Sequence, residues 1–263
     1  MKKVICLLVV GEKYEKQFSK NKSQFYLYAQ NCGAEIKIIN TPLDATHKRP
    51  LLSQKLLIPS LVKEYDIALF MDLDIKINKN APSIFDVLPK EKSFGAITDP
   101  RGTEEYIKTW GNEKRITEES TLSYFETRNF SANSNLKGSI NGGVFVFRPL
   151  EVFDLFENYY YSDHDQGPFN SYEEGPMAYL TQSNDSFFNI DPKFNLQILY
   201  KLKGTKEGNE IINNQKKIPS IIRKYYQRKF KTVLFPTKSY RNFVEEHLQQ
   251  NWFIHFAGGY PLV

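Results

Sequence analysis

The feature that most constrains this chain is an apolar run that ends in two closely spaced carboxylates. Residues 67–71 are all apolar, a length that suits a buried strand and is too short for a membrane span. Asp72 and Asp74 follow, one residue apart, and on a strand both would point the same way. Two like charges held together need a cation or solvent. We therefore predict a metal site at the carboxyl end of a strand, where open α/β sheets bind ligands; the alternative is a solvated turn.

Segments with strand and helix patterns alternate over the first hundred residues. The expected order is strand 4–10, helix 14–31, strand 35–39, helix 51–63, strand 67–71, short helix 82–88 and strand 94–98. Strand, helix and strand in succession imply right-handed parallel crossovers, and hence a largely parallel sheet with helices on both faces. At 263 residues, the chain is long enough for one substantial α/β core.

Beyond residue 100 the alternation is interrupted before it resumes. Residues 101–139 are polar and contain several glycines, so we expect a long loop over the cleft. Gly142 and Gly143 then precede an apolar strand, which indicates either close approach of the backbone to a ligand or a plain turn. The elements expected after them are helix 150–159, a helix from 173 to 181 and strand 187–190.

Four motifs share an order and a rough spacing with one enzyme superfamily. They are Asp72-Leu73-Asp74, Asn141-Gly142-Gly143-Val144-Phe145-Val146, Glu173-Glu174-Gly175-Pro176 and Ile254-His255-Phe256-Ala257-Gly258-Gly259-Tyr260-Pro261. Together they resemble the GT-A glycosyltransferases, above all the branch of glycogenin and the bacterial lipopolysaccharide galactosyltransferases. The resemblance implies a GT-A, Rossmann-like fold: a mixed, mostly parallel sheet flanked by helices in a single domain, 1–263. It also implies a nucleotide-sugar half, 1–100, and an acceptor half, 140–263, with a C-terminal helical basic segment.

The resemblance also assigns metal and donor residues. Asp72, Asp74 and His255 would hold Mn²⁺ or Mg²⁺ under the donor diphosphate, and carboxylate and imidazole both suit such ions. The implied donor-binding residues are Val9, Val10, Gly11, Lys55, Asp72, Asp99, Asn141, Gly142, Gly143 and Gly258. A structural histidine and an exposed helix lysine are the alternatives for His255 and Lys55. Tyr260 departs from the family, which has a diphosphate-binding lysine there.

Glu173 and Glu174 are the candidate catalytic residues, with Asp163 and Asp165 behind them. Transfer with inversion needs a carboxylate base that takes the acceptor proton, whereas transfer with retention can use the leaving diphosphate. The alternative role for these acids is to cap and solvate the start of a helix. The sequence does not decide the stereochemistry.

The predicted function is metal-dependent transfer of a sugar from a nucleotide donor, a UDP-sugar, to an acceptor hydroxyl in surface-glycan or lipid-linked oligosaccharide synthesis. One alternative is a degenerate, non-catalytic glycosyltransferase fold that binds glycans or nucleotide sugars, which the tyrosine at 260 keeps open. A second is a haloacid-dehalogenase-type phosphatase, because residues 70–75 also resemble the nucleophile strand of those enzymes. Phosphatases of that type need a later apolar strand closed by paired acids, and we find none.

The charge is unevenly distributed, although the net charge is only +5. Residues 201–241 hold twelve basic and two acidic residues, +10, so the remainder sums to −5. Within them, residues 218–231 predict an amphipathic basic helix, which favours an anionic membrane surface. The alternatives are that its apolar stripe packs on the sheet, or that nucleic acid is the partner.

Two cysteines make no disulfide framework, and the apolar run at the N-terminus lacks a signal-peptide cleavage site. We therefore expect a cytoplasmic protein. The basic helix at 218–231 adds the expectation that it is peripheral at the inner face of a membrane.

Overall fold

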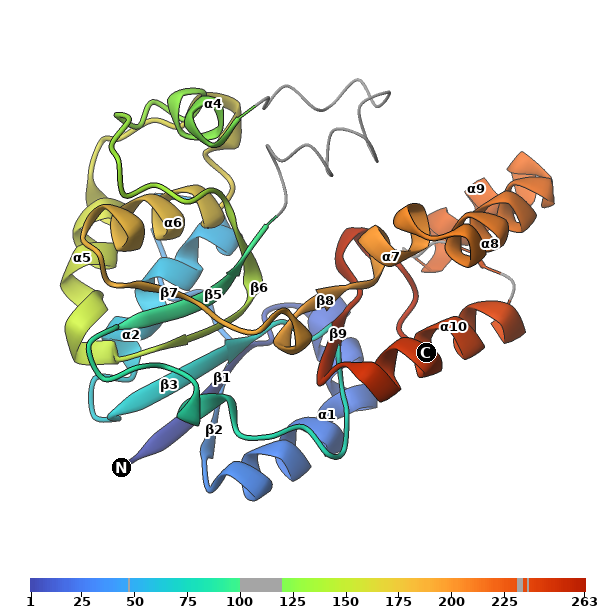
Figure 1. Ribbon diagram of the computed structural model, residues 1–263, viewed down its shortest axis with the longest axis horizontal. Helices are drawn as coiled ribbons and strands as arrows, with labels where there is room; N and C mark the ends of the chain where they lie inside the picture. The colour runs from blue at the N-terminus through green and yellow to red at the C-terminus, as the bar shows by residue number, and fades with distance from the viewer. Residues whose placement is uncertain (47, 100–119, 231–233, 236) are drawn as a thin grey trace. The chain divides into compact units, whose positions relative to one another are not determined.

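The structure is a computed structural model that describes residues 1–46, 48–99, 120–230, 234–235 and 237–263. The chain forms two compact units (Figure 1). The first comprises Met1–Leu73 and Ser83–Asp191, and the second Asp74–Pro82 and Pro192–Val263. Residues 101–119 of the loop expected at 101–139 lie outside the described residues, as does Lys231 of the basic helix, and the described remainder of that loop contains a short helix, Thr121–Glu126. The division into a nucleotide-sugar half and an acceptor half stays a prediction.

A six-stranded sheet forms the centre of the first unit. Its strands are β1 (Lys3–Leu8), β2 (Glu35–Ile39), β3 (Ile67–Met71), β5 (Phe94–Thr98), β6 (Ile140–Phe147) and β7 (Phe187–Asn189), in the order β2-β1-β3-β6-β5-β7. The pairs β1–β2, β1–β3 and β5–β7 are parallel, whereas β6 is antiparallel to both its neighbours. The predicted mixed, mostly parallel sheet is confirmed. Because β6 is antiparallel, its first residues lie beside the carboxyl ends of β3 and β5.

Helices flank this sheet (Figure 1). They are α1 (Glu12–Cys32), η1 (Leu51–Leu57), α2 (Ile58–Leu61), η2 (Ile84–Asp86), α4 (Thr121–Glu126), α5 (Pro149–Tyr161), η3 (Gly167–Phe169) and α6 (Glu174–Ser183). Gly33 ends α1 in the left-handed conformation, which glycine adopts without strain.

The helix expected at 51–63 is instead a 3₁₀ segment followed by one α-helical turn. Pro59 lies in the first turn of α2, where a backbone N–H would have no partner within the helix, so its absence costs no hydrogen bond. A new helix therefore begins at this point, and the 3₁₀ segment does not continue through it. The helix expected at 82–88 is likewise only the 3₁₀ turn η2. Gly142 and Gly143, which were expected to precede a strand, lie within strand β6.

Stacked aromatic rings form much of the core of the first unit. Phe145 of β6 stacks on Phe70 of β3 and on Phe94 of β5, with ring centroids 4.9 and 5.4 Å apart. Phe156 of α5 meets Phe94 edge-on at 5.6 Å and so joins the helix to the sheet. Such pairs add to the stability that burial of the rings already provides.

The second unit has a small sheet and a run of helices. Its strands are β4 (Ile75–Ile77), β8 (Leu196–Gln197) and β9 (Phe253–His255), in the order β4-β9-β8. Its helices are η4 (Pro192–Phe194), α7 (Ile198–Gly204), α8 (Lys206–Lys217), α9 (Ser220–Phe230), α10 (Thr237–Gln250) and η5 (Ala257–Gly259). Phe243 and Val244 of α10 pack with Ile254 of β9 in its core. The helices α7 to α10 confirm the predicted C-terminal helical basic segment.

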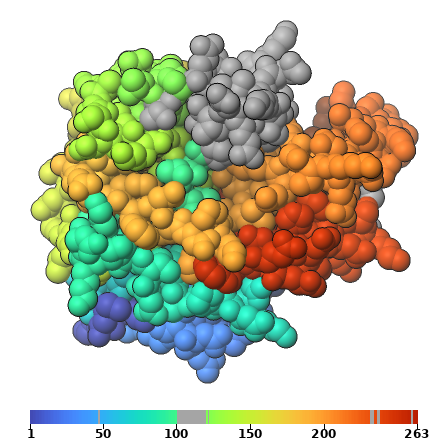
Figure 2. Space-filling view, viewed as in Figure 1, coloured from blue at the N-terminus to red at the C-terminus, as the bar shows by residue number. Residues whose placement is uncertain are grey.

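The side chains of α8 and α9 are visible at the surface (orange in Figure 2).

Among the described residues, no helix has both the length and the apolar character needed to cross a bilayer.

Candidate functional site

Asp72 lies directly after β3, beside the first residues of β6. Its backbone N–H donates to the carbonyl of Gly143 at 2.8 Å, which extends the β3–β6 pairing by one residue. Asn141 accepts a hydrogen bond from the Gly143 N–H through its side-chain oxygen, at 3.0 Å. The structure thus brings the Asp-x-Asp segment and the Asn-Gly-Gly segment together at one edge of the sheet.

A buried lysine joins this edge to the start of α6. The Nζ of Lys55 lies 3.0 Å from Oδ1 of Asp72, 2.8 Å from Oε1 of Glu173 and 3.0 Å from the carbonyl oxygen of Gly142. Lys55 is only 2% exposed and Glu173 3%, so the ion pair is almost fully withdrawn from water. The alternative of an exposed helix lysine is wrong.

Gly142 has no room for a side chain because the Glu173 carboxylate occupies the space beside it. A Cβ at this position would lie 2.6 Å from Oε1 of Glu173. The Gly142 N–H also donates to Oε1 of Glu174 at 3.1 Å. The close approach that this glycine permits is therefore between the β6 backbone and the two acids that begin α6.

Burial and neighbouring charge act in opposite directions on this cluster. Burial lowers the pKa of Lys55, but the charges of Asp72 and Glu173 outweigh it, so the net shift of this pKa is upward. Burial raises the pKa of Glu173 to about 7, and the nearby charge of Glu174 adds to the rise while Lys55 opposes it. Lys55 is thus a permanent cation, whereas Glu173 is harder to ionise than an ordinary glutamate.

The other predicted donor residues of the first unit lie at the carboxyl ends of its strands. Val9 follows β1 and donates its N–H to the carbonyl of Ile39 at 2.7 Å. Half-buried Val10 and exposed Gly11 come next, and Gly11 caps α1 with a φ of 90°. Asp99 follows β5, is 5% exposed and donates its N–H to the Ser139 carbonyl at 2.8 Å.

Asp163 and Asp165, the second pair of candidate acids, lie in the loop after α5 and have other contacts. Asp163 is exposed and lies 3.4 Å from the Nζ of Lys48. Hydrogen bonds from the Gly167 N–H, at 2.7 Å, and from the Asn170 side chain lower the pKa of Asp165. These bonds hold the loop, so the structure supplies a structural role for both acids.

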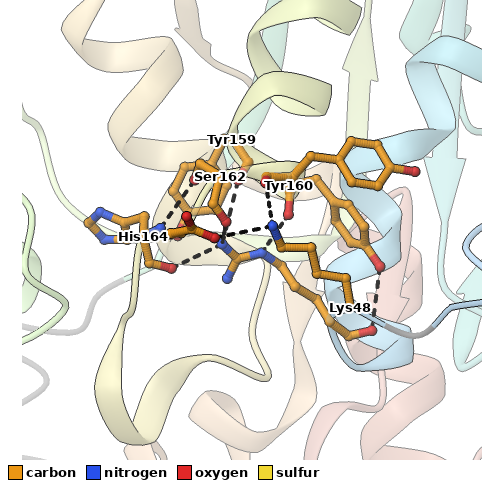
Figure 3. Close-up of polar contacts among 8 residues, drawn as sticks. Lys48, Tyr159, Tyr160, Ser162 and His164 are labelled. Atoms are coloured by element: carbon orange, nitrogen blue, oxygen red, sulfur yellow. Dashed lines mark hydrogen bonds and ion pairs between the residues drawn. The ribbon is translucent and has the colours of Figure 1, made fainter.

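The same loop shows a polar cluster that the sequence did not suggest (Figure 3). Arg49 is buried and donates to the backbone carbonyls of Tyr160, Ser162 and His164, at 2.8, 3.1 and 2.9 Å. The last carbonyls of a helix lack partners within it, and a cation there also complements the helix dipole. Arg49 therefore closes the end of α5, and this cluster is structural.

In the second unit, His255 and Asp74 form a close pair. Asp74 precedes β4 and His255 ends β9, where Ile75 pairs with His255 across the small sheet. The Nε2 of His255 lies 3.4 Å from Oδ1 of Asp74, and the Phe256 N–H donates to the Asp74 carbonyl at 2.9 Å. His255 is 4% exposed, which keeps its ring in a fixed, dry setting.

Asn195 orients the His255 ring, and the sequence interpretation missed it. Its Oδ1 lies 3.0 Å from Nδ1 of His255, and Asn195 is fully buried. With that oxygen as the acceptor, Nδ1 carries the hydrogen, which leaves Nε2, the nitrogen beside Asp74, as the one available to a metal ion. A metal-binding histidine is usually held in this way through its second nitrogen. The only mark of Asn195 in the sequence is an asparagine five residues after the strand expected at 187–190.

Gly258 and Tyr260 lie close together in the second unit. Gly258 has a φ of 78°, a conformation that glycine adopts without strain. The ring of Tyr260 stacks near Phe235, with centroids 5.5 Å apart, and packs against the core of the unit. The residue that replaces the family's lysine therefore has a packing role.

The family model of glycosyl transferase family 8 matches residues 1–260. No curated relative matches the chain. Among solved structures, a glycosyltransferase involved in the glycosylation of the major capsid of PBCV-1 is similar over 98% of this chain and 94% of its own, with a TM-score of 0.54 and 15% identity. The WbbM bifunctional glycosyltransferase is similar over 99% of this chain and 46% of its own, with a TM-score of 0.55 and 12% identity. An active-site mutant of LgtC is similar over 97% of this chain and 87% of its own, with a TM-score of 0.52 and 11% identity. At these identities the likeness shows the fold alone, and the fold is the predicted GT-A fold.

Proposed function

Because the chain belongs to glycosyl transferase family 8, we propose that it moves a sugar from a UDP-sugar to a hydroxyl of a carbohydrate acceptor with the help of a divalent metal ion. Membership of this family identifies the chain as a glycosyltransferase. The phosphatase hypothesis is therefore wrong, and the non-catalytic alternative loses its support.

The observation that carries the metal proposal is the pair of Asp74 and His255, oriented by Asn195. Asp72 precedes Asp74 by two residues, so the extended chain keeps their Cα atoms within about 7 Å of each other. The set of possible ligands is two carboxylates and one imidazole, which suits Mn²⁺, with Mg²⁺ as the second choice. Such an ion would neutralise the charge that develops on the departing diphosphate.

We assign the rest of the donor site to the carboxyl edge of the large sheet. Open α/β sheets bind ligands at this edge, and the segment 9–11 and Asp99 follow two of its strands. Backbone groups of Asn141, Gly142 and Gly143 border the same edge, and Gly258 of the second unit stays a predicted donor residue. Contacts of these residues with the nucleotide and the sugar stay a prediction.

Glu173 and Glu174 remain the proposed acid–base residues, and their different contacts support different roles. Glu173 is buried against Lys55, whereas Glu174 is half-buried and accepts the Gly142 N–H. A general base must come within hydrogen-bond reach of the acceptor hydroxyl. We therefore assign that role to Glu174 if the reaction inverts, and a supporting role to Glu173.

Release of sugar from a panel of UDP-, GDP- and TDP-sugars tests the proposal. We expect hydrolysis of one UDP-sugar that requires Mn²⁺ and stops when a chelator is added. A UDP-sugar should also raise the melting temperature only with the metal, because a ligand stabilises a protein when it binds the folded state. Turnover that a chelator leaves unchanged would refute the metal role. Turnover of another nucleotide sugar alone would refute the donor assignment.

We also propose that α9 rests on an anionic membrane surface, where a lipid-linked acceptor would lie at the cytoplasmic face. None of its described residues is buried: Ile221 is 76% exposed, Ile222 48% and Tyr225 62%. The second unit itself therefore does not cover this stripe. An isolated helix of eleven residues is marginal in water, so a surface that covers its apolar side would stabilise it.

A further inference from the structure

A small cavity lies between the end of α8 and the helix α9 in the second unit (Figure 1). Its volume is about 220 Å³, below the roughly 300–1,000 Å³ of sites for drug-sized ligands, so it suits a single small group. One half-buried residue of α8, Gln215, contributes to its wall. The other lining residues come from α9 and the chain after it: Ser220, Arg223, Lys224, Gln227 and Leu234.

The four lining residues of α9 share one face of the helix. Their positions recur at spacings of three and four residues, which brings side chains together on a helix. The exposed apolar residues Ile221, Ile222 and Tyr225 stand at positions between them and so lie on a different face. The cavity is therefore separate from the stripe that we assign to a membrane surface.

The wall of the cavity carries positive charge and no acid. Residues 215–234 contain seven lysines and arginines and no aspartate or glutamate. Within the part of the chain that the structure describes, neither Arg223 nor Lys224 forms an ion pair with a carboxylate. Cations gathered without acids repel one another, and a concave surface lined by one sign of charge attracts ions of the opposite sign. The cavity therefore favours an anion.

The turn between the two helices fixes Arg223. Its Nε donates to the carbonyl of Ile218 at 3.0 Å, and the residue is half-buried. A guanidinium has five N–H donors, so four remain after this bond for a ligand or water. A planar donor group held in this way suits the paired oxygens of a phosphate. Lys224 and the side-chain amides of Gln215 and Gln227 line the same space and can donate to further oxygens.

We propose that this cavity binds a phosphate group, carried either by a small phosphorylated molecule or by a lipid headgroup. A phosphate monoester has a charge near −2 at neutral pH and three strong acceptor oxygens, which match the two cations and the several donors of the wall better than a carboxylate does. The cavity contains none of the metal or donor residues. The proposal is therefore independent of the proposed transfer of a sugar.

Calorimetric titration of the metal-free full chain with inorganic phosphate, at constant ionic strength, tests this proposal. The double variant Arg223→Gln/Lys224→Gln should bind phosphate about tenfold more weakly or worse, because it loses charge-assisted hydrogen bonds. The matched control is Arg228→Gln/Lys229→Gln, which removes the same charge from the same helix outside the cavity. Its affinity should stay within about twofold of wild type, because exposed charges farther away are screened.

Equal loss of affinity in the two double variants would show that the total charge of α9 attracts phosphate, and would overturn the proposal. So would wild-type protein that binds no phosphate. Lys224→Glu, with Arg228→Glu as its control, gives the same comparison without disturbing the hydrogen bond between Arg223 and Ile218. Circular dichroism of each variant checks that it is folded.

Vesicles distinguish the two sources of the phosphate. If a lipid headgroup enters the cavity, Arg223→Gln/Lys224→Gln should lose more binding to phosphatidic acid vesicles than its control does. If the source is a soluble phosphate ester, the two variants should lose vesicle binding equally. Asp74→Asn should bind phosphate as wild type does, whether or not the metal assignment is right. Loss of phosphate binding in that variant would place the anion at the predicted donor site and would overturn the proposal.

Discussion

Substitution of Gly142 by alanine tests the packing around the buried ion pair. The new Cβ would lie 2.6 Å from Oε1 of Glu173, closer than real contacts allow, and 3.2 Å from Cγ of Glu174, which is tighter than most real contacts. Glu173 cannot move aside freely because Lys55 holds its carboxylate at 2.8 Å. Overpacking a site of this kind costs about 1–3 kcal/mol, and breaking a buried ion pair about 3–5 kcal/mol.

We therefore expect Gly142→Ala to lower the free energy of unfolding by about 3 kcal/mol. With a urea m-value of about 2–3 kcal/mol/M, the midpoint should fall by about 1 M or more. Far-UV circular dichroism in urea measures it. Gly204→Ala is the control, because Gly204 ends α7 and nothing lies within 4 Å of its added Cβ; its midpoint should be unchanged or slightly higher.

A double-mutant cycle with Glu173→Ala then identifies the cause. Once the carboxylate is gone, Gly142→Ala should cost much less, with a coupling energy of about 2 kcal/mol between the two positions. If the alanine costs nothing in wild type, or costs the same in both backgrounds, the account of Gly142 given above is wrong.

Four further outcomes follow from the site and from α9. Asp74→Asn should abolish Mn²⁺-dependent UDP-sugar binding in calorimetry while the fold persists; unchanged affinity would remove Asp74 from the ligand set. His255→Ala should weaken Mn²⁺ binding about 10- to 100-fold or more; early melting with wild-type Mn²⁺ affinity would make the histidine structural. Between pH 4.5 and about 7 the folded state keeps a proton on Glu173 that the unfolded chain has lost, so the free energy of unfolding should fall as pH rises; urea titrations of Glu173→Gln should lack this decline. The chain should co-sediment with anionic liposomes at low salt and dissociate at high salt, and equal binding to neutral vesicles or preference for nucleic acid would contradict the membrane proposal.

The large sheet could be predicted from the sequence because its elements have local causes. Residues 67–71 carry no polar side chain, so only a buried strand suits them, and Gly33 ends α1 by supplying a left-handed residue. The antiparallel direction of β6 could not be predicted. The direction depends on the path between β5 and β6 and on pairing across the sheet. The periodicity of residues within one strand carries no information about either.

Roles that depend on distant partners were harder to assign. Lys55 fits a helical pattern equally well as an exposed residue, and its burial follows only from Asp72 and Glu173, which come from other elements. Asn195 belongs to no motif, and it becomes relevant only because β8 pairs with β9 and places it beside His255. A motif identifies residues that could bind a ligand, whereas the residues that hold them in place are found through tertiary contacts.

The α9 helix shows the same limit on the surface of the protein. Its sequence predicts a helix with an apolar stripe, because Ile221, Ile222 and Tyr225 recur at helical spacing. Periodicity alone cannot say whether such a stripe faces the protein or something outside it. In the structure none of the described residues of α9 is buried, so the second unit itself does not cover the stripe. An apolar stripe left in water beside four basic residues, Arg223, Lys224, Arg228 and Lys229, is costly for an isolated protein. The same arrangement is favourable at a surface that is apolar beneath and anionic above, and this argues for a lipid bilayer as the partner over a nucleic acid, which would use the charges but leave the apolar side chains exposed.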